Sequence, residues 1–176
     1  PKYSEKVKVI YNLINTEEIK ELSEENINYS FNEPTIVAVG RLAQQKRFDI
    51  LIKAHSLLIN EGIKHKLLIL GEGNEEDYLK KLITELNVDN SVSLHGFVKN
   101  PYPFIKNSDI YVMSSDFEGL PLVICEALVL GKAIVSTDCT GPNELLKDGT
   151  GLLVPCNNHN ELKEAIKFLL CNRDIK

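Results

Sequence analysis

Glu118 and Glu126 are the two residues of this 176-residue chain whose type and setting best suit chemistry. Glu126 is the only charged residue in the segment 122–130, whose other members are Leu, Val, Ile, Cys and Ala. A carboxylate among apolar neighbours is costly unless it is hydrogen-bonded, and the paired hydroxyls of a ribose are donors that would satisfy it. An ion pair with a basic group that serves packing alone is the alternative.

Glu118 lies in a turn between an expected strand and an expected helix. The strand covers residues 110–115, the turn is Asp-Phe-Glu-Gly, and Pro121 suits the first turn of the helix that follows. In an open parallel sheet, ligands bind beyond the carboxyl ends of the strands, beside helix N-termini that attract oxygen-rich groups. The sequence therefore places Glu118 at a ligand-binding edge.

Two cations, Arg41 and Lys46, follow another expected strand at 35–40. Composition alone favours two solvated surface charges, but paired cations would also stabilise the negative charge of a departing diphosphate. The nearby Gly-Glu-Gly at 71–73 is expected to be a tight strand-to-helix turn. It lacks the third glycine of a dinucleotide fingerprint, since Glu76 stands there, so NAD is not expected.

Alternation of apolar β-branched runs with helical periods predicts an α/β fold, a Rossmann-like parallel sheet of about six strands with helices on both faces. His55 falls on the apolar face of one such helix and is expected to be a core or interface histidine. The expected strands are 7–11, 35–40, 66–71, 91–96, 110–115, 133–137 and 151–155, and the expected helices are 16–24, 48–59, 79–86 and 161–170, with 28–33 as loop.

Bulk properties exclude several classes of protein. A hydrophobic fraction of 43% and a charged fraction of 26% are those of a globular domain, and the net charge of −5 without a basic patch argues against nucleic acid as a partner. The four cysteines form no CxxC pair and the histidines have no ligand spacing, so no metal site is expected. Apolar runs are too short to cross a bilayer.

Several segments together resemble a known family. Glu118-GLPLVIC-Glu126 looks like the E-x7-E signature of retaining glycosyltransferases with the two-Rossmann GT-B fold, in the large group called family 4 or group 1. The likeness also covers a Gly-Arg…Lys phosphate segment at 40–52, the strand and turn after it at 67–73 and a base-side strand at 92–98. It extends to a later segment at 140–155 and to the passage into the second domain at 6–22.

The resemblance implies a role for each candidate residue. Glu126 would hold the ribose hydroxyls, and Glu118 would face the transferred sugar. Arg41 and Lys46, in a segment that begins at Gly40, would grip the diphosphate in place of a metal. Backbone groups would make the other contacts, those of Gly119, Leu120 and Leu122 to sugar or phosphate and those of Phe97 and Val98 to the base.

The implied activity is transfer of a sugar from a UDP- or GDP-sugar to a glycan or lipid-linked acceptor, as in polysaccharide, capsule or lipopolysaccharide biosynthesis. Residues 1–30 would be an interdomain connector or edge segment, and 31–176 the nucleotide-sugar-binding domain. The N-terminal acceptor domain would be absent, so this piece is expected to bind nucleotide without transferring sugar. No cofactor is implied. The enzyme would be cytoplasmic, either free or peripheral to the inner face of the membrane.

Two other interpretations stay open. A sugar-nucleotide epimerase or phosphorylase with the same two-domain plan would have a similar binding half. A non-catalytic α/β signalling module is less favoured, because strand 7–11 has no neighbouring carboxylates for a phosphoacceptor site. The chain also departs from the family pattern twice. Arg47 stands where a glycine often follows the phosphate lysine and is a candidate for an added phosphate contact, and Leu120-Pro121 replaces a frequent Phe-Gly.

Overall fold

Six parallel strands form one sheet in the order β3-β2-β1-β4-β5-β6 within residues 12–172, the part of the chain that the computed structural model describes. The predicted strand at 7–11 lies outside these residues. The strands are β1 (Thr35–Val39), β2 (Lys66–Leu70), β3 (Val92–Gly96), β4 (Ile110–Met113), β5 (Ala133–Thr137) and β6 (Leu152–Val154). The strand order reverses between β1 and β4, which makes their carboxyl ends the topological switch point of the sheet.

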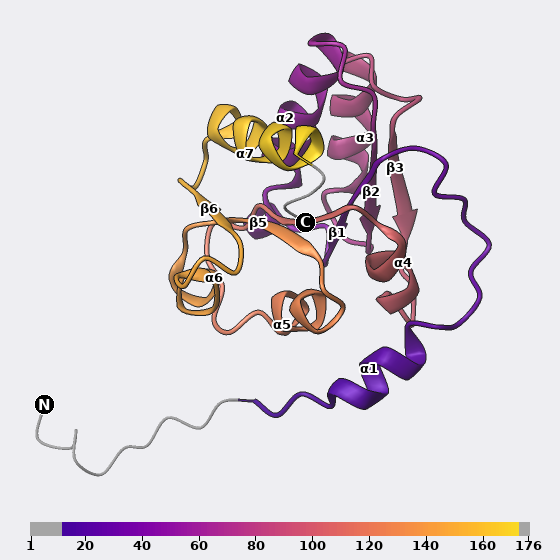
Figure 1. Cartoon of the computed structure of the whole chain (residues 1–176). Helices are drawn as coiled ribbons and strands as arrows, with labels where there is room; N and C mark the ends of the chain where they lie inside the picture. Colours follow the sequence, from indigo (N-terminus) through magenta and orange to yellow (C-terminus); the bar gives the residue numbers. More distant parts are fainter. Residues whose placement is uncertain (1–11, 173–176) are drawn as a thin grey trace, which may run out of the picture.

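Helices cover both faces of this sheet (Figure 1). The first face is covered by α2 (Phe48–Asn60), α3 (Glu76–Glu85) and α7 (His159–Cys171). The second is covered by α4 (Tyr102–Asn107), α5 (Leu122–Val129) and α6 (Thr140–Leu146), and α1 (Thr16–Leu22) packs on α4 and α5. A 3-10 turn, η2 (Gln44–Lys46), precedes α2. The predicted fold class is confirmed.

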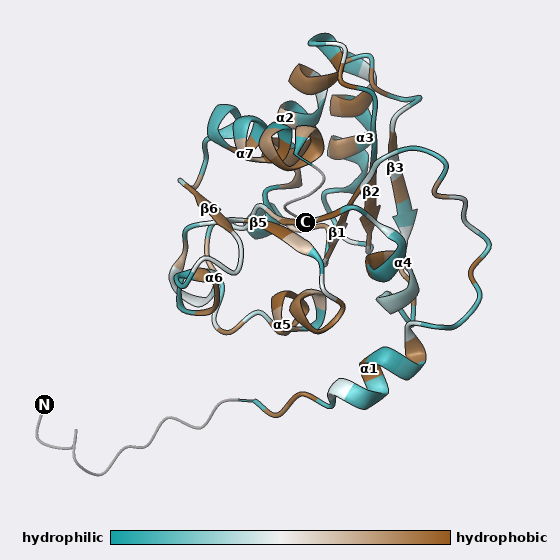
Figure 2. Ribbon diagram, in the orientation of Figure 1, coloured by the Kyte–Doolittle hydropathy of each residue, from teal (hydrophilic) through white to brown (hydrophobic). Residues whose placement is uncertain are grey.

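The strands are apolar on both sides because each side has its own core. Ile36 and Ala38 of β1 pack into the cluster under α2, α3 and α7, whereas Val37 packs into the cluster under α4 and α5. The same alternation separates Ile110 from Tyr111 in β4. Figure 2 shows the resulting pattern, with apolar strands in the middle and polar residues on the outer sides of most helices.

Two short helices were not expected from the sequence. Both contain a proline, Pro103 in α4 and Pro142 in α6, and both are too short to show a full helical period. Proline is tolerated in the first turn of a helix, where the backbone N–H has no partner. The other described strands and helices lie where predicted, with ends that differ by a few residues. None of the helices within residues 12–172 is both long and apolar enough to cross a membrane.

Helix α6 packs against the turn between β4 and α5 through a glycine. A Cβ atom at Gly141 would lie 1.6 Å from the carbonyl oxygen of Gly119 and 2.7 Å from Cδ of Pro121. Backbone atoms cannot yield as a flexible side chain would, so Gly141 fixes the turn at residues 116–121 against α6. Gly119 itself has open space around its own Cβ position.

A buried chain of hydrogen bonds joins α2 to the strands beside it. Nδ1 of His55 lies 2.8 Å from Nε2 of His65, Nε2 of His55 lies 2.8 Å from Oγ of Ser91, and Nδ1 of His65 lies 2.8 Å from the carbonyl of Ile63. The Ile63 carbonyl can only accept, so neutral rings require His65 to donate to it, His55 to donate to His65, and Ser91 to donate to His55. The expectation of a core or interface histidine is confirmed, since His55 is fully buried.

We predict that Gly141→Ala lowers the free energy of unfolding by roughly 1–3 kcal/mol or more, because the new methyl group collides with backbone. The matched variant Gly119→Ala should change it by no more than about 0.5 kcal/mol. Urea unfolding followed by circular dichroism measures both. Equal stabilities for the two variants would show that α6 does not fix this turn.

We also predict that acid destabilises the fold through His55. Burial lowers the pKa of His55 from 6.5 to about 3, with smaller contributions from His65 and Lys66. Because the pKa is lowered on folding, protons bind the unfolded state more tightly. The contribution to stability is therefore complete above pH 6.5 and decreases as the pH falls toward 3. The free energy of unfolding should fall by about 2 kcal/mol from this group between about pH 7 and pH 5.

Urea unfolding at both pH values, with His55→Gln as the control, measures this contribution. The variant should lose less stability than the parent over the same pH interval. An unchanged difference between the two pH values would mean that His55 does not cause the pH dependence.

Candidate functional site

The residues after β1 and β4 come together at the switch point, where Lys46 meets Glu118. Nζ of Lys46 lies 2.6 Å from Oε1 of Glu118, and Oγ of Ser115 donates to the same oxygen at 2.7 Å. The two charged side chains are largely buried, with 21% of Lys46 and 13% of Glu118 exposed. Both donors use Oε1, and within the described residues 12–172 no donor reaches Oε2 of Glu118, which is left for a further donor.

Gly40 gives Lys46 its path to Glu118. A Cβ atom at Gly40 would lie 3.2 Å from Cε and 3.4 Å from Cδ of Lys46, so the aliphatic part of Lys46 runs across the Gly40 backbone. A larger residue at position 40 would have to displace that side chain. Gly40 thus lies directly against the side chain of Lys46.

Three hydrogen bonds hold the η2 turn against the residues after β4. Oγ of Ser114 donates to the carbonyl of Lys46 at 2.8 Å, and Nε2 of Gln45 donates to the carbonyl of Phe117 at 2.7 Å. The backbone N–H of Asp116 donates to the carbonyl of Gln45 at 2.9 Å. Lys46 and Glu118 therefore lie on two segments that are bonded to each other along their length.

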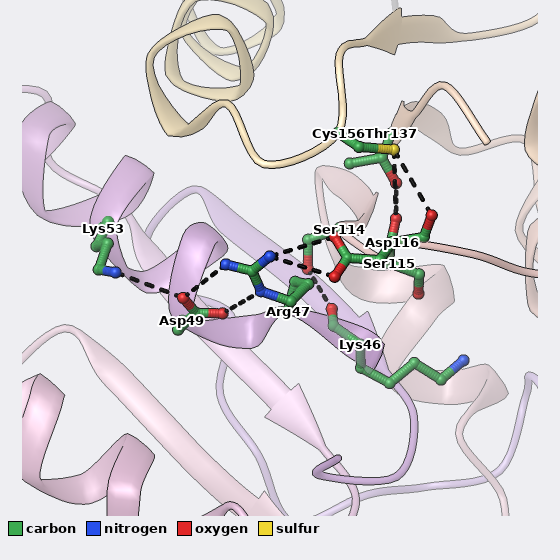
Figure 3. Close-up of polar contacts among 9 residues, drawn as sticks. All are labelled: Lys46, Arg47, Asp49, Lys53, Ser114, Ser115, Asp116, Thr137 and Cys156. Atoms are coloured by element: carbon green, nitrogen blue, oxygen red, sulfur yellow. Dashed lines mark hydrogen bonds and ion pairs between the residues drawn. The ribbon is translucent and has the colours of Figure 1, made fainter. Parts of the chain in front are cut away.

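Arg47 differs from its neighbour Lys46 in conformation and in contacts. Its backbone is left-handed, with φ 49° and ψ 41°, which costs a non-glycine residue about 1–2 kcal/mol and explains a preference for glycine at this place. Its guanidinium group is paired with Asp49 and Asp116 (Figure 3). Burial would raise the pKa of the Asp49 carboxyl, but the hydrogen bonds and charge of Arg47 outweigh it and hold that pKa below its usual value.

Arg41 follows Gly40 directly and is exposed. Within residues 12–172 no ion pair joins it to the carboxylates of the site, so the structure brings Lys46 and Glu118 together but leaves Arg41 at the rim. Its charge lies on the same edge of the sheet as Lys46.

Glu126, on α5, has a neutral partner that the sequence interpretation missed. The hydroxyl of Tyr102, at the start of α4, donates to Oε1 of Glu126 at 3.1 Å. Burial raises the pKa of Glu126, and the Tyr102 hydrogen bond opposes that rise. Among residues 12–172, Glu126 has no ion pair with a basic side chain.

The Glu126 carboxylate adjoins an open pocket of about 170 Å³ between α1, α4 and α5. Its lining includes Tyr102, Glu126 and Leu122, which is 41% exposed, together with Leu13, Ile14, Asn15, Glu18 and Ile19. The carboxylate is half-buried rather than enclosed, so a polar group in the pocket could reach it.

The backbone groups named from the sequence lie after β3 and between β4 and the start of α5. Helix α5 begins at Leu122, and Pro121 precedes it without a side-chain cap. The N–H of Ile124 donates to the carbonyl of Pro121 at 3.1 Å, so within residues 12–172 the N–H groups of Leu122 and Val123 are the ones left at this end of the helix for a ligand. Gly119 and Leu120 form the turn before it. Phe97 and Val98 follow β3, and Phe97 is 69% exposed. The base-side strand expected over 92–98 ends at Gly96, so Phe97 and Val98 lie in the loop after it.

Residues that could ligate a metal do not gather in the described part of the chain. No group of three or more His, Cys, Asp or Glu side chains between residues 12 and 172 is arranged to hold a metal ion. The four cysteines are free thiols. The side chains that join the segments after β1 and β4 are instead two ion pairs, Lys46 with Glu118 and Arg47 with Asp116, together with hydroxyl groups.

Known proteins resemble this chain in sequence and in structure. An N-acetylgalactosaminyltransferase of Campylobacter jejuni that acts on a diphospho-undecaprenol-linked sugar is 37% identical over 167 residues, which are 94% of this chain and 44% of that protein. The lipopolysaccharide core biosynthesis glycosyltransferase LpsE of Rhizobium meliloti is 30% identical over 99% of this chain and 50% of its own length. The chain thus spans about half the length of these relatives.

The structure of HepE from Anabaena in complex with UDP and glucose matches with a TM-score of 0.80 and 26% identity, over 95% of this chain and 48% of HepE. The family model of glycosyl transferases group 1 matches residues 19–176, nearly the whole chain. On this evidence the chain belongs to the group 1 glycosyl transferases.

Proposed function

We propose that this chain is the nucleotide-sugar-binding domain, the C-terminal half, of a retaining GT-B glycosyltransferase of family 4. The observation that carries the proposal is the contact of Lys46 with Glu118 at the carboxyl ends of β1 and β4, in a chain of a glycosyl transferase family. Ligands of open α/β sheets bind at this place. The chain would bind a UDP- or GDP-sugar, and the other half of the enzyme would bind a glycan or lipid-linked acceptor.

Lys46 would stabilise the leaving group. When the sugar departs, negative charge develops on the diphosphate, and a cation that is already in place stabilises that charge without reorganisation. Lys46 is held by the η2 turn and by Gly40, so its ammonium group needs little ordering. Arg41, at the rim, would supply a second charge, and the two together would do the work of a divalent metal.

Glu118 and Glu126 would bind the two ends of the donor. Oε2 of Glu118 would accept a hydrogen bond from a hydroxyl of the transferred sugar, next to the uncapped start of α5. Glu126 would accept from the ribose hydroxyls, and Tyr102 would hold its carboxylate in place. The backbone at Gly119, Leu120 and Leu122 would contact sugar or phosphate, and that at Phe97 and Val98 would contact the base.

Relatives with named activities support glycan synthesis as the process. One acts on an undecaprenol-linked sugar and another serves lipopolysaccharide core biosynthesis. By analogy the acceptor of the whole enzyme would be a growing glycan or a lipid-linked sugar, and the enzyme would act in the cytoplasm or at the inner face of the membrane. This chain alone would bind the donor without transferring its sugar.

Nucleotide binding tests the proposal directly. UDP, GDP and ADP are added separately, and the melting temperature is measured by differential scanning fluorimetry. A ligand at a hundred times its dissociation constant adds about 2.7 kcal/mol, which raises the melting temperature of a domain of this size by roughly 5–10 °C. At least one nucleotide should do so. Lys46→Met should abolish most of the rise, and no shift with any of the three would contradict the proposal.

Substitutions of the two carboxylates should affect the binding of the bare nucleotide and of the sugar-bearing donor differently. Glu126→Ala should weaken binding of the bare diphosphate by roughly tenfold or more, because charge-assisted hydrogen bonds to ribose are lost. Glu118→Gln should leave bare diphosphate binding unchanged or tighter, since Lys46 is released from its partner, but should remove any advantage of the sugar-bearing donor. Calorimetric titration measures both. Identical effects of the two substitutions on both ligands would contradict the assigned roles.

A further inference from the structure

We propose that Arg47 and Asp116 form a positioning contact for Lys46, and that Arg47 does not bind phosphate. The inference rests on the proposed function of Lys46 as a diphosphate-binding residue. It assigns a role to two charged residues that lie beside the candidate site but outside the E-x7-E pattern.

The side chains of Lys46 and Arg47 diverge although the residues are adjacent. Figure 3 shows the Arg47 guanidinium turned toward Asp49 and Asp116, while the Lys46 side chain extends away from them. The left-handed backbone of Arg47 separates the two directions, because it ends the η2 turn and begins α2. Arg47 therefore does not extend the Lys46 cation into a larger phosphate-binding patch.

All three nitrogens of the Arg47 guanidinium already donate to carboxylates. Nε and Nη2 of Arg47 lie 2.9 Å and 3.2 Å from the two oxygens of Asp49, and Nη1 lies 3.2 Å and 3.3 Å from those of Asp116. Only 20% of the Arg47 side chain is exposed. A planar fork with two carboxylates around it is held in one orientation.

This contact joins the two segments that carry the proposed site. Arg47 follows Lys46 directly, and Asp116 precedes Glu118 by two residues. Through Asp49 the same guanidinium is tied to the first turn of α2, and Lys53 also pairs with Asp49. The segment after β4 is thus anchored to a rigid helix. The Arg47–Asp116 ion pair adds a charged contact to the neutral hydrogen bonds that Lys46 and Gln45 make with the residues after β4.

The negative charge of Asp116 is unfavourable for the binding of a diphosphate nearby. A carboxylate close to a diphosphate site repels the ligand, so Coulomb's law predicts tighter binding when Asp116 is neutralised. If Arg47 were a phosphate ligand, its release from Asp116 would also tighten binding. A positioning role predicts the opposite, because the loss of the contact lets the Lys46 segment move away from Glu118.

The test compares Asp116→Asn with Asp49→Asn by calorimetric titration with UDP, GDP and ADP. Both substitutions remove one carboxylate from the same guanidinium, but only Asp116 links Arg47 to the segment after β4. Asp116→Asn should weaken nucleotide binding by about three- to tenfold, and Asp49→Asn by less than about twofold. Unchanged or tighter binding by Asp116→Asn overturns the inference.

A second background separates positioning from general loss of stability. In Arg47→Gly, which suits the left-handed backbone, Asp116 has lost its partner and only its repulsion remains, so adding Asp116→Asn should tighten binding instead of weakening it. The same loss in both backgrounds overturns the inference. Lys46→Met distinguishes the two proposals, because unchanged nucleotide binding by that variant would contradict the proposed function itself, whatever Asp116 does.

Discussion

The adjacency of β1 and β4 is the constraint on which the rest of the site depends. Lys46 and Glu118 are 72 positions apart in the chain, and they meet because each follows one of these two neighbouring parallel strands. The neighbouring strands are held by cores on both faces of the sheet, so the distance between the two segments is fixed by burial and not by the charged residues. The ion pair is a result of the fold more than a cause of it.

Burial and hydrogen bonding determine how well the charge of each carboxylate, Glu118 and Glu126, is stabilised. Glu118 is covered by Lys46 and Ser115, which stabilise its charge directly. Glu126 has only the neutral Tyr102 hydroxyl, so burial keeps its pKa above the usual value and leaves its charge incompletely compensated. A group in that condition gains most from additional donors. This difference supports separate roles for two glutamates that the sequence presents as a pair.

The sequence was sufficient for features that depend on pattern and insufficient for features that depend on contacts between distant residues. Apolar runs on both faces predict the strands, and the position of Glu118 after a strand places it at the carboxyl edge of the sheet, where β4 ends. Tyr102 was missed because its partner Glu126 is 24 positions away and because α4 is short and contains a proline. The sequence leaves Arg47 open as a phosphate contact, since neither its left-handed backbone nor its pairing with Asp116 is visible in a local pattern.

Arg47 also illustrates how a locally unfavourable residue is retained. A left-handed backbone costs an arginine about 1–2 kcal/mol that a glycine would not lose. A single exposed ion pair, at about 0–1 kcal/mol, would not offset that cost. Arg47 instead has two carboxylates around a mostly buried guanidinium. Asp49 belongs to the first turn of α2, whereas Asp116 belongs to the segment after β4. The contact therefore contributes order between segments as well as energy, which a glycine with a relaxed backbone could not supply.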